Sequence, residues 1–241
     1  TFNAAPDVTV DMLVSEFNLY ANSIPGLKLW LNGFDVNGDN LADTTGHFGP
    51  GNKVSMWKDR SDAGNHVTQG TDVNMPVWND PSTQTNGKPT ITFTRSSQQA
   101  LLLNNALGLS GHPSMTVITV AKKTTTGMLM QIGANTGAPG NVISFHPGGG
   151  GINYGNGGKN FGGGFPANAV TLGSWRLKNP ATYADGQFFQ NGAELTGGSI
   201  DNGGGTANLP ASNNELILGV ARNASGALES WFNGNISELL V

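Results

Sequence analysis

The residues with the clearest potential for chemistry form one acidic run, Asp35-Val36-Asn37-Gly38-Asp39-Asn40-Leu41-Ala42-Asp43. Oxygen-bearing side chains stand at alternating positions of this run, and the Leu41 carbonyl is available between the last two of them. Ca²⁺ takes about six to eight oxygen ligands, which short loops of alternating acidic residues supply. The sequence therefore predicts a structural calcium site whose ligands are Asp35, Asn37, Asp39, Leu41 and Asp43.

A metal-free turn rich in Asx residues is the alternative for the same run. The run resembles EF-hand and dockerin loops, but those have Gly where Asn40 stands and a bidentate Glu where Gly46 stands. Asn tolerates the left-handed conformation that Gly adopts at such a position. Three carboxylates that converge without a cation would repel one another, which favours the metal. We expect a bound ion to make the loop rigid rather than to take part in a reaction.

Sequence patterns that would indicate catalysis are absent. A retaining glycosidase needs two carboxylates about 5–5.5 Å apart, and no strand-like segment carries the corresponding Glu-x-Asp-x-x-Glu spacing. The four His residues have neither the H-x-x-x-H nor the H-E-x-x-H spacing of zinc hydrolases. A G-x-S-x-G elbow, a phosphate-binding loop and a dinucleotide fingerprint are also missing. We therefore expect a protein that is not an enzyme.

The elements that position these residues are predicted to be strands. Short apolar or alternating runs are separated by clusters of Gly, Asn, Asp and Pro. Asn86-Gly87, Asp185-Gly186 and Asn191-Gly192 provide residues for tight hairpin turns. Many short strands without intervening helices favour an antiparallel sandwich or barrel. The clearest predicted strands cover residues 27–34, 54–58, 90–94, 115–121, 128–132, 142–145, 172–177, 187–190, 216–220 and 231–241.

One helical pattern stands near the start of the chain. Apolar residues recur at three- and four-residue spacing from Val10 to Ala21, which predicts a short helix that Pro25-Gly26 would end. We expect residues 1–26 to form a helical extension and residues 27–241 to form one domain. Because the chain begins at Thr1 rather than Met, we interpret it as a processed or excised piece.

The composition excludes several classes of protein. The chain has 36 Gly, 12 Pro and no Cys, and only 12% of its residues are charged, against an average of about 25%. A chain so poor in Lys, Glu and Ala is not a coiled coil, and the lack of Cys excludes disulfides and thiolate metal sites. The chain has 12 Lys and Arg against 16 Asp and Glu, so its composition does not indicate a basic surface for binding nucleic acid. No apolar run approaches the roughly 20 residues of a membrane-spanning helix.

The segment from Pro147 to Pro166, PGGGGINYGNGGKNFGGGFP, concentrates the glycine. Gly gives the backbone conformational freedom, so this segment is predicted to be a loop or an irregular hairpin. A flexible surface loop is one interpretation. The other is a binding loop that presents Tyr154, Phe161 and Phe165 to a ligand.

Several further stretches carry the signature of a known family. VSMWKDRSDAGNHVTQ looks like the pattern W-x-D-x-S-G-N-x-N-x-x-x-Q, with Trp57, Asp59, Ser61, Asn65 and Gln69 in place. It is accompanied by LKLWLNGFDVNGDNLAD, NGKPTITF with QALLL, SMTVITVAKK, LILGVARN and WFNGNISELLV. Together, and in this order, they resemble LamG-like modules of the concanavalin A-like lectin/glucanase superfamily, as found in large bacterial surface proteins. The resemblance covers residues 27–241. One departure is Thr94-Arg95-Ser96-Ser97, which replaces the usual Asp-Gly turn.

The resemblance implies an all-β fold, namely a two-sheet antiparallel jelly-roll sandwich of the concanavalin A type. Loops at one rim of such a sandwich bind ligands and are often organised by Ca²⁺. The alternation of Ile91 with Phe93 fits sheets that bury every second residue between them. We expect core positions, with sugar contact as the alternative, for the Trp residues that lie within strand patterns: Trp30, Trp57 and Trp231.

The function implied by the resemblance is that of a non-catalytic, calcium-stabilised, glycan-binding or adhesive module of a secreted or cell-surface protein. Aromatic faces pack on the apolar patches of sugars, while polar groups bind the hydroxyls. The predicted contacts with such an extracellular polysaccharide, none of them placed by a motif, are Trp78, Tyr154, Phe161, Phe165 and Trp175. The alternative is a structural subunit or spacer of a surface filament or layer. In that case residues 1–23 or the terminal strand would dock onto a neighbouring module or a copy of the chain.

Overall fold

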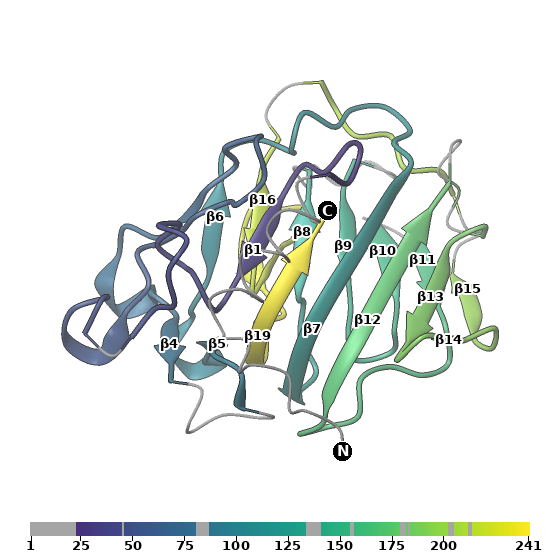
Figure 1. Ribbon diagram of the computed structural model, residues 1–241. Coiled ribbons are helices and arrows are strands. Elements are labelled where there is room, and N and C mark those ends of the chain that lie inside the picture. The colour runs from purple at the N-terminus through teal and green to yellow at the C-terminus, as the bar shows by residue number, and fades with distance from the viewer. Residues whose placement is uncertain are drawn as a thin grey trace, which may run out of the picture.

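The computed structural model describes residues 23–44, 46–80, 87–133, 141–154, 157–178, 182, 184–201, 205–211 and 214–241. Antiparallel strands in two layers form the framework of this part of the chain (Figure 1). Its helical elements are three short 3₁₀ turns, η1 (Pro50–Asn52), η2 (Asp72–Asn74) and η5 (Arg95–Ser97). The helix predicted between Val10 and Ala21 lies outside the described residues, so the division at residue 26 stays a prediction. Within the described ranges, no helix has the length and hydrophobicity needed to cross a membrane.

The first layer, called sheet A, has eight strands in the order β14-β13-β12-β7-β19-β5-β4, with β1 also paired to β19. In β7 and β12, side chains alternate between buried and exposed positions, as expected where one face of a sheet covers a core. Sheet A consists of β1 (Trp30–Asn32), β4 (Val77–Asn79), β5 (Thr90–Phe93), β7 (Met115–Thr125), β12 (Val170–Leu177), β13 (Gln187–Gln190), β14 (Ala193–Glu194) and β19 (Asn233–Leu240).

The second layer, called sheet B, has nine strands in the order β15-β11-β10-β9-β8-β16-β6-β3-β2. A separate hairpin of β17 (Ala221–Arg222) and β18 (Leu228–Glu229) contacts it, and the Arg222 backbone N–H donates to Gln131 Oε1 at 3.0 Å. Sheet B consists of β2 (Met56–Trp57), β3 (Val67–Thr68), β6 (Leu101–Leu103), β8 (Met130–Ile132), β9 (Ile143–Phe145), β10 (Ile152–Tyr154), β11 (Gly157–Asn160), β15 (Ser199–Asp201) and β16 (Leu216–Leu218).

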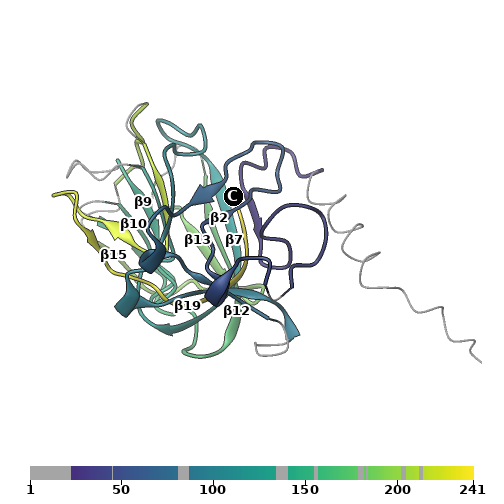
Figure 2. The same ribbon diagram turned by 90° about the vertical axis from the view of Figure 1, so that its left-hand side faces the viewer.

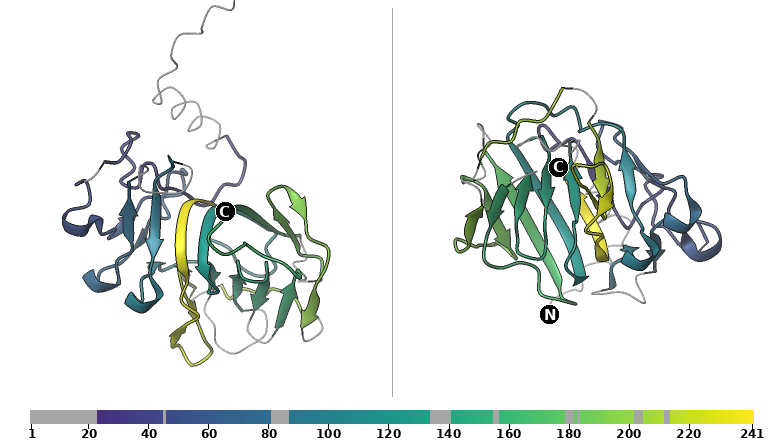
Figure 3. Two further views of the ribbon diagram at one scale, coloured as in Figure 1. Left: turned by 90° about the horizontal axis from the view of Figure 1, so that it is seen from below. Right: turned by 180° about the vertical axis from the view of Figure 1, so that it is seen from behind.

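Figures 2 and 3 show the two sheets from the side, from below and from behind. One apolar core fills the space between them. At its centre the Trp175 ring stacks on Phe188, with ring centroids 4.9 Å apart, and meets Phe145 edge-on at 5.7 Å. Full burial of a large apolar side chain contributes about 1.5–3 kcal/mol. The structure thus confirms the predicted all-β, two-sheet antiparallel sandwich.

The strands follow the sequence pattern closely where that pattern is strong. Every predicted strand segment overlaps an observed strand, and β13 coincides with its prediction. Asn191 and Gly192 form the tight turn between β13 and β14 and adopt φ of 50° and 84°, as predicted. The additional strands are only two to four residues long, so their alternation is too brief to read from the sequence.

The glycine-rich segment is a packed part of the sandwich rather than a surface loop. It contributes the antiparallel pair β10–β11 to sheet B, and Phe161 and Phe165 are 2% and 1% exposed. A Cβ on Gly164 would lie 2.3 Å from the Pro147 carbonyl oxygen, so the backbone approach requires glycine there. The interpretation as an irregular hairpin is confirmed, and the interpretation as a flexible surface loop is wrong.

Candidate functional site

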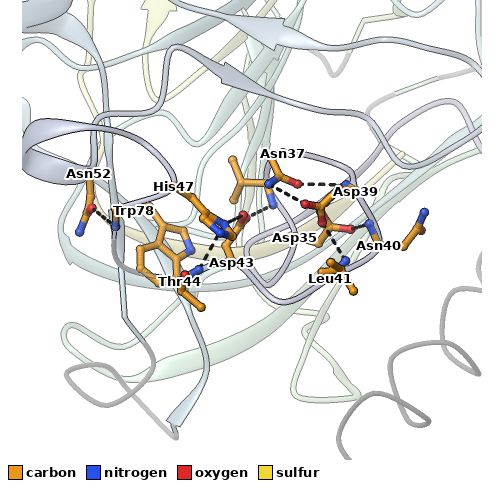
Figure 4. A network of polar contacts seen from close by, with 12 residues as sticks. Asp35, Asn37, Asp39, Asn40, Leu41, Asp43, Thr44, His47, Asn52 and Trp78 are labelled. Atoms are coloured by element: carbon orange, nitrogen blue, oxygen red, sulfur yellow. Dashed lines mark hydrogen bonds and ion pairs between the residues drawn. The ribbon is translucent and has the colours of Figure 1, made fainter.

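The acidic run 35–43 is held by hydrogen bonds to its own backbone (Figure 4). The Asp35 carboxylate accepts hydrogen bonds from the backbone N–H groups of Asp39 and Asn40, at 3.0 and 2.8 Å. It also forms an ion pair with the Arg60 guanidinium. Asp39 in turn accepts a hydrogen bond from the Leu41 backbone N–H at 2.8 Å. These are the contacts of the Asx-rich turn that was the alternative to a metal loop.

Asp43 is the centre of a second group of hydrogen bonds in the same loop. Figure 4 shows this group separate from the hydrogen bonds around Asp35. Its Oδ2 accepts a hydrogen bond from the Val36 backbone N–H, and its Oδ1 lies 2.9 Å from Nδ1 of His47. Both Asp35 and Asp43 are buried, and buried carboxylates need such partners.

The predicted calcium ligands do not fit the ion in this arrangement. Arg60 and backbone donors stand where a cation would contact Asp35. In the described ranges, no group of three or more His, Asp or Glu side chains is placed to hold a metal ion. Calcium binding by Asp35, Asn37, Asp39, Leu41 and Asp43 stays a prediction, and it requires Arg60 to leave Asp35.

The residues that carry the family resemblance in VSMWKDRSDAGNHVTQ have structural contacts. The Asp59 carboxylate accepts hydrogen bonds from the backbone N–H groups of Trp30, Ser61 and Asn65, all at 2.8–2.9 Å. The side-chain amide of Gln69 donates to the Ala100 carbonyl at 3.0 Å. These contacts tie the segment between β2 and β3 to β1, and the residue after β3 to the residue before β6. The motif therefore stabilises the fold and does not by itself form a binding site.

The predicted sugar contacts lie mostly in the core. Trp78, Phe161, Phe165 and Trp175 are 0–2% exposed. Trp175 faces inward because it occupies a buried position in the alternation of β12. A ring without an exposed face cannot stack on a sugar, so the prediction that these four rings contact a ligand is wrong for this conformation. The side chain of Tyr154 lies outside the described part of the chain.

A pocket of about 350 Å³ opens where the strand ends of the two sheets meet. In sheet A, Phe93 and Thr125, the last residues of β5 and β7, lie beside the start of β19. In sheet B, β9 ends beside the start of β8. We call this hollow the rim pocket, and its lining residues are Arg95, Thr126, Gly127, His146, Ser230 and Trp231.

The backbone around Trp231 is fixed from two sides. The Arg95 Nε donates to the Trp231 carbonyl at 2.9 Å, and the Met128 backbone N–H donates to the Ser230 carbonyl at 2.7 Å. A Cβ on Gly127 would lie 2.3 Å from the Trp231 carbonyl oxygen, so this close approach requires glycine. The pocket therefore stands on rigid strand ends, as binding loops on a rigid scaffold do.

Trp231 is the one Trp of the five that keeps part of its surface exposed. Its ring packs against a small apolar cluster around Ile217 on the outer side of sheet B. Among the described residues, none accepts a hydrogen bond from its indole N–H. The other four indole N–H groups donate inside the protein: Trp30 to Glu238, Trp57 to Asn32, Trp78 to Gly33 and Trp175 to Gly150. The core position predicted for Trp231 is therefore wrong in part.

The polar lining of the rim pocket is a mixture of donors and acceptors. Burial lowers the pKa of His146 to about 4, so at neutral pH its imidazole is uncharged and offers one N–H donor and one nitrogen acceptor. Thr126 and Ser230 have hydroxyl groups, and Arg95 brings a positive charge. None of the six lining residues is a carboxylate, whereas glycoside hydrolysis generally uses two.

The sequence held a weak signal for these residues. Arg95 stands in the segment where the chain departs from the family pattern, and that segment forms η5 beside the pocket. Trp231 lies between a hairpin and the last strand, and the register of β19 shifts next to it, between Asn233 and Gly234. A strand pattern extended back to Trp231 therefore misassigns its orientation.

Comparisons with known proteins found similarity in structure. No family profile and no curated protein sequence matches the chain. The chain is similar to domain 4 of AbnA, a GH43 extracellular arabinanase from Geobacillus stearothermophilus, solved in complex with arabinotriose. The TM-score is 0.54 and the identity 23%, over 89% of this chain and 90% of that one. This similarity covers nearly the whole sandwich and agrees with the fold described above.

Two other solved structures are more distant. One is the Ruminococcus gnavus IT-sialidase CBM40 bound to α2,3-sialyllactose, with a TM-score of 0.38 and 13% identity over 54% of this chain and 75% of that chain. The other is the native heptameric SAP-like pentraxin from Limulus polyphemus, with a TM-score of 0.40 and 15% identity over 70% of this chain and 76% of that chain.

Proposed function

We propose that this chain is a non-catalytic glycan-binding module and that the rim pocket is its binding site. The observation that carries the proposal is the partly buried Trp231, which lines the pocket beside a neutral imidazole, a guanidinium and two hydroxyl groups. Sugars present an apolar face and a set of hydroxyls, and such a pocket complements both. Among the lining residues there is no carboxylate pair, which supports a binding rather than a hydrolytic role.

The fold supports the same proposal. The AbnA domain has this sandwich and was solved in complex with arabinotriose, although that ligand is known only for that domain. A volume of about 350 Å³ lies at the lower end of the range for small-molecule sites, about 300–1,000 Å³. The rim pocket therefore suits a chain end or a short stretch of a glycan rather than a long stretch.

We further propose that the module belongs to a secreted or cell-surface protein, where it holds that protein on an extracellular polysaccharide. The AbnA domain that shares its fold comes from an extracellular enzyme. In this proposal the acidic run is a structural element, with Arg60 or a calcium ion as the cation beside Asp35.

A glycan array followed by calorimetric titration of the best ligand tests the proposal. We expect Trp231→Ala to weaken binding by about two- to twelvefold, since loss of an aromatic contact costs about 0.5–1.5 kcal/mol. Leu172→Ala, an exposed apolar position on β12 outside the rim pocket, is the matched control and should bind as the unmodified chain does. The proposal fails if the array shows no glycan bound, or if both variants bind equally well.

A further inference from the structure

A larger hollow, of about 620 Å³, lies at the opposite end of sheet A from the rim pocket. The start of β7, the end of β12 and the end of β19 form its floor, and residues 24–28 form one wall. We call it the outer groove, because Thr116, Ile118 and Arg176 occupy the exposed positions of their strands there.

The outer groove leaves large apolar side chains uncovered. Ile24 is 46% exposed and Ile118 is 37% exposed, and both line the groove together with the half-buried Leu240. Single exposed apolar residues are ordinary on a protein surface, but apolar residues gathered in one hollow offer a surface on which another element can pack.

The charged side chains of the outer groove all have the same sign. Lys28, Arg176 and Lys178 line it, and none of its lining residues is acidic. Residues 1–22, which directly precede the described chain, contain three acidic residues and no Lys or Arg. The two parts of the chain are therefore complementary in charge.

Residues 1–22 also carry the apolar surface that would match the groove. Val10, Leu13, Val14, Phe17 and Tyr20 recur at three- and four-residue spacing, which predicts one apolar face on a helix. A helix of about 12 residues is marginal in water by itself and needs an apolar surface to pack on. Its length, about 18 Å at 1.5 Å per residue, suits a hollow that crosses the ends of neighbouring strands.

We propose that residues 1–22 dock as an amphipathic helix into the outer groove of their own chain. The described chain begins at Ser23, and Ile24–Lys28 already line the groove, so the segment starts at its edge. A tether this short gives the segment a high effective concentration at the groove, which favours it over the same segment of a second copy. Apolar side chains of the helix cover Ile118 and Leu240, and its acidic side chains face Lys28, Arg176 and Lys178.

The lack of Cys in the natural chain makes a thiol-labelling test clean. Ile118→Cys places one thiol in the groove of the full chain, and Leu172→Cys places one on the same face of sheet A outside it. We expect maleimide to react about tenfold more slowly at position 118 than at position 172, because a docked helix must open before the reagent enters. Adding Leu13→Asp and Phe17→Asp should make the two rates equal.

Three results would overturn the proposal. Equal labelling rates at positions 118 and 172, with residues 1–22 unchanged, would show that the groove is open. Slow labelling that persists after Leu13→Asp and Phe17→Asp would show that another element covers it. Protection that fades on dilution, together with a dimer mass in light scattering, would identify a second copy as the occupant. If Ile118→Cys does not fold, Thr116→Cys supplies a second exposed position in the groove for the same comparison.

Discussion

Two aromatic groups in this protein stand beside backbone that requires glycine, and they differ in exposure. Beneath the glycine-rich segment, Trp175 lies between Phe165 and Phe188, at centroid distances of 5.7 and 4.9 Å, and is fully buried. At the rim, Trp231 is fixed against Gly127 yet keeps part of its ring exposed. Glycine therefore shows where the backbone packs closely, whereas the position of a ring relative to the core decides whether it can contact a ligand.

The largest expected effect is a difference in stability between variants that lack one or the other of these two rings. Trp175→Ala should lower the free energy of unfolding by about 3–5 kcal/mol, because it empties the centre of the core. Trp231→Ala removes a side chain that is only partly buried and should cost about 1 kcal/mol, near the average for a point substitution. Chemical denaturation of both variants measures the difference. Equal losses would mean that Trp231 is a core residue and would remove the basis for the rim pocket.

The acid sensitivity of the rim provides the next test. The pKa of His146 is lowered by burial from 6.5 to about 4, so between these values the unfolded chain binds a proton that the folded chain does not. Stability contributed by this group is present above pH 6.5 and is lost as the pH falls to about 4, by up to about 3 kcal/mol. Denaturation of His146→Gln at several pH values should show a shallower decline than the unmodified chain.

Glu238 is the control for that pH comparison, because its shift has the opposite sign. Burial raises the pKa of this carboxyl, although the hydrogen bond from Trp30 Nε1 opposes the rise. Its contribution to stability is therefore greatest at low pH and declines as the pH rises through the folded-state pKa. A His146→Gln variant whose stability follows the unmodified profile between pH 6.5 and 4 would contradict the assignment of that decline to His146.

Replacing a glycine of the packed segment by alanine should have a smaller effect on stability. Gly164→Ala places a Cβ against the Pro147 and Gly148 carbonyl oxygens and should cost about 1–3 kcal/mol, as overpacking does. Gly70→Ala is the matched control, since nothing lies within 4 Å of its added Cβ, and it should change stability by less than about 0.5 kcal/mol. Thermal unfolding of the two variants measures both. If Gly164→Ala were as stable as Gly70→Ala, the segment would not be packed as described.

The smallest expected effect concerns calcium. With Arg60 paired to Asp35 and a backbone N–H donating to each of its two carboxylate oxygens, we expect Ca²⁺ to give little heat in calorimetry and little change in Tm. A ligand at about 100 times its Kd adds about 2.7 kcal/mol of stability. A rise in Tm that corresponds to this gain in stability, and that Asp35→Asn lacks, would show that the ion displaces Arg60. It would restore the calcium site.

The sequence predicted most of the fold because alternation and turn residues are local signals. The strand at residues 187–190 and its Asn191-Gly192 turn coincide with β13 and the turn that follows it. The candidate site was not predictable in the same way. Whether Trp175 faces inward and Trp231 outward depends on strand phase and on the register shift of β19, which only the paired sheet defines. Likewise, the glycines of residues 147–166 indicate freedom in the sequence but close packing in the fold.

The most direct test of the rim pocket follows the five indole N–H signals in a ¹H–¹⁵N NMR titration with the best ligand of the glycan array. Trp231→Phe assigns one of these signals by its disappearance. We expect the Trp231 signal to shift with ligand, because Trp231 lines the rim pocket. The other four signals should stay in place, because their N–H groups are bound inside the protein. A ligand that shifts the Trp175 signal and leaves the Trp231 signal unmoved would contradict binding at the rim pocket.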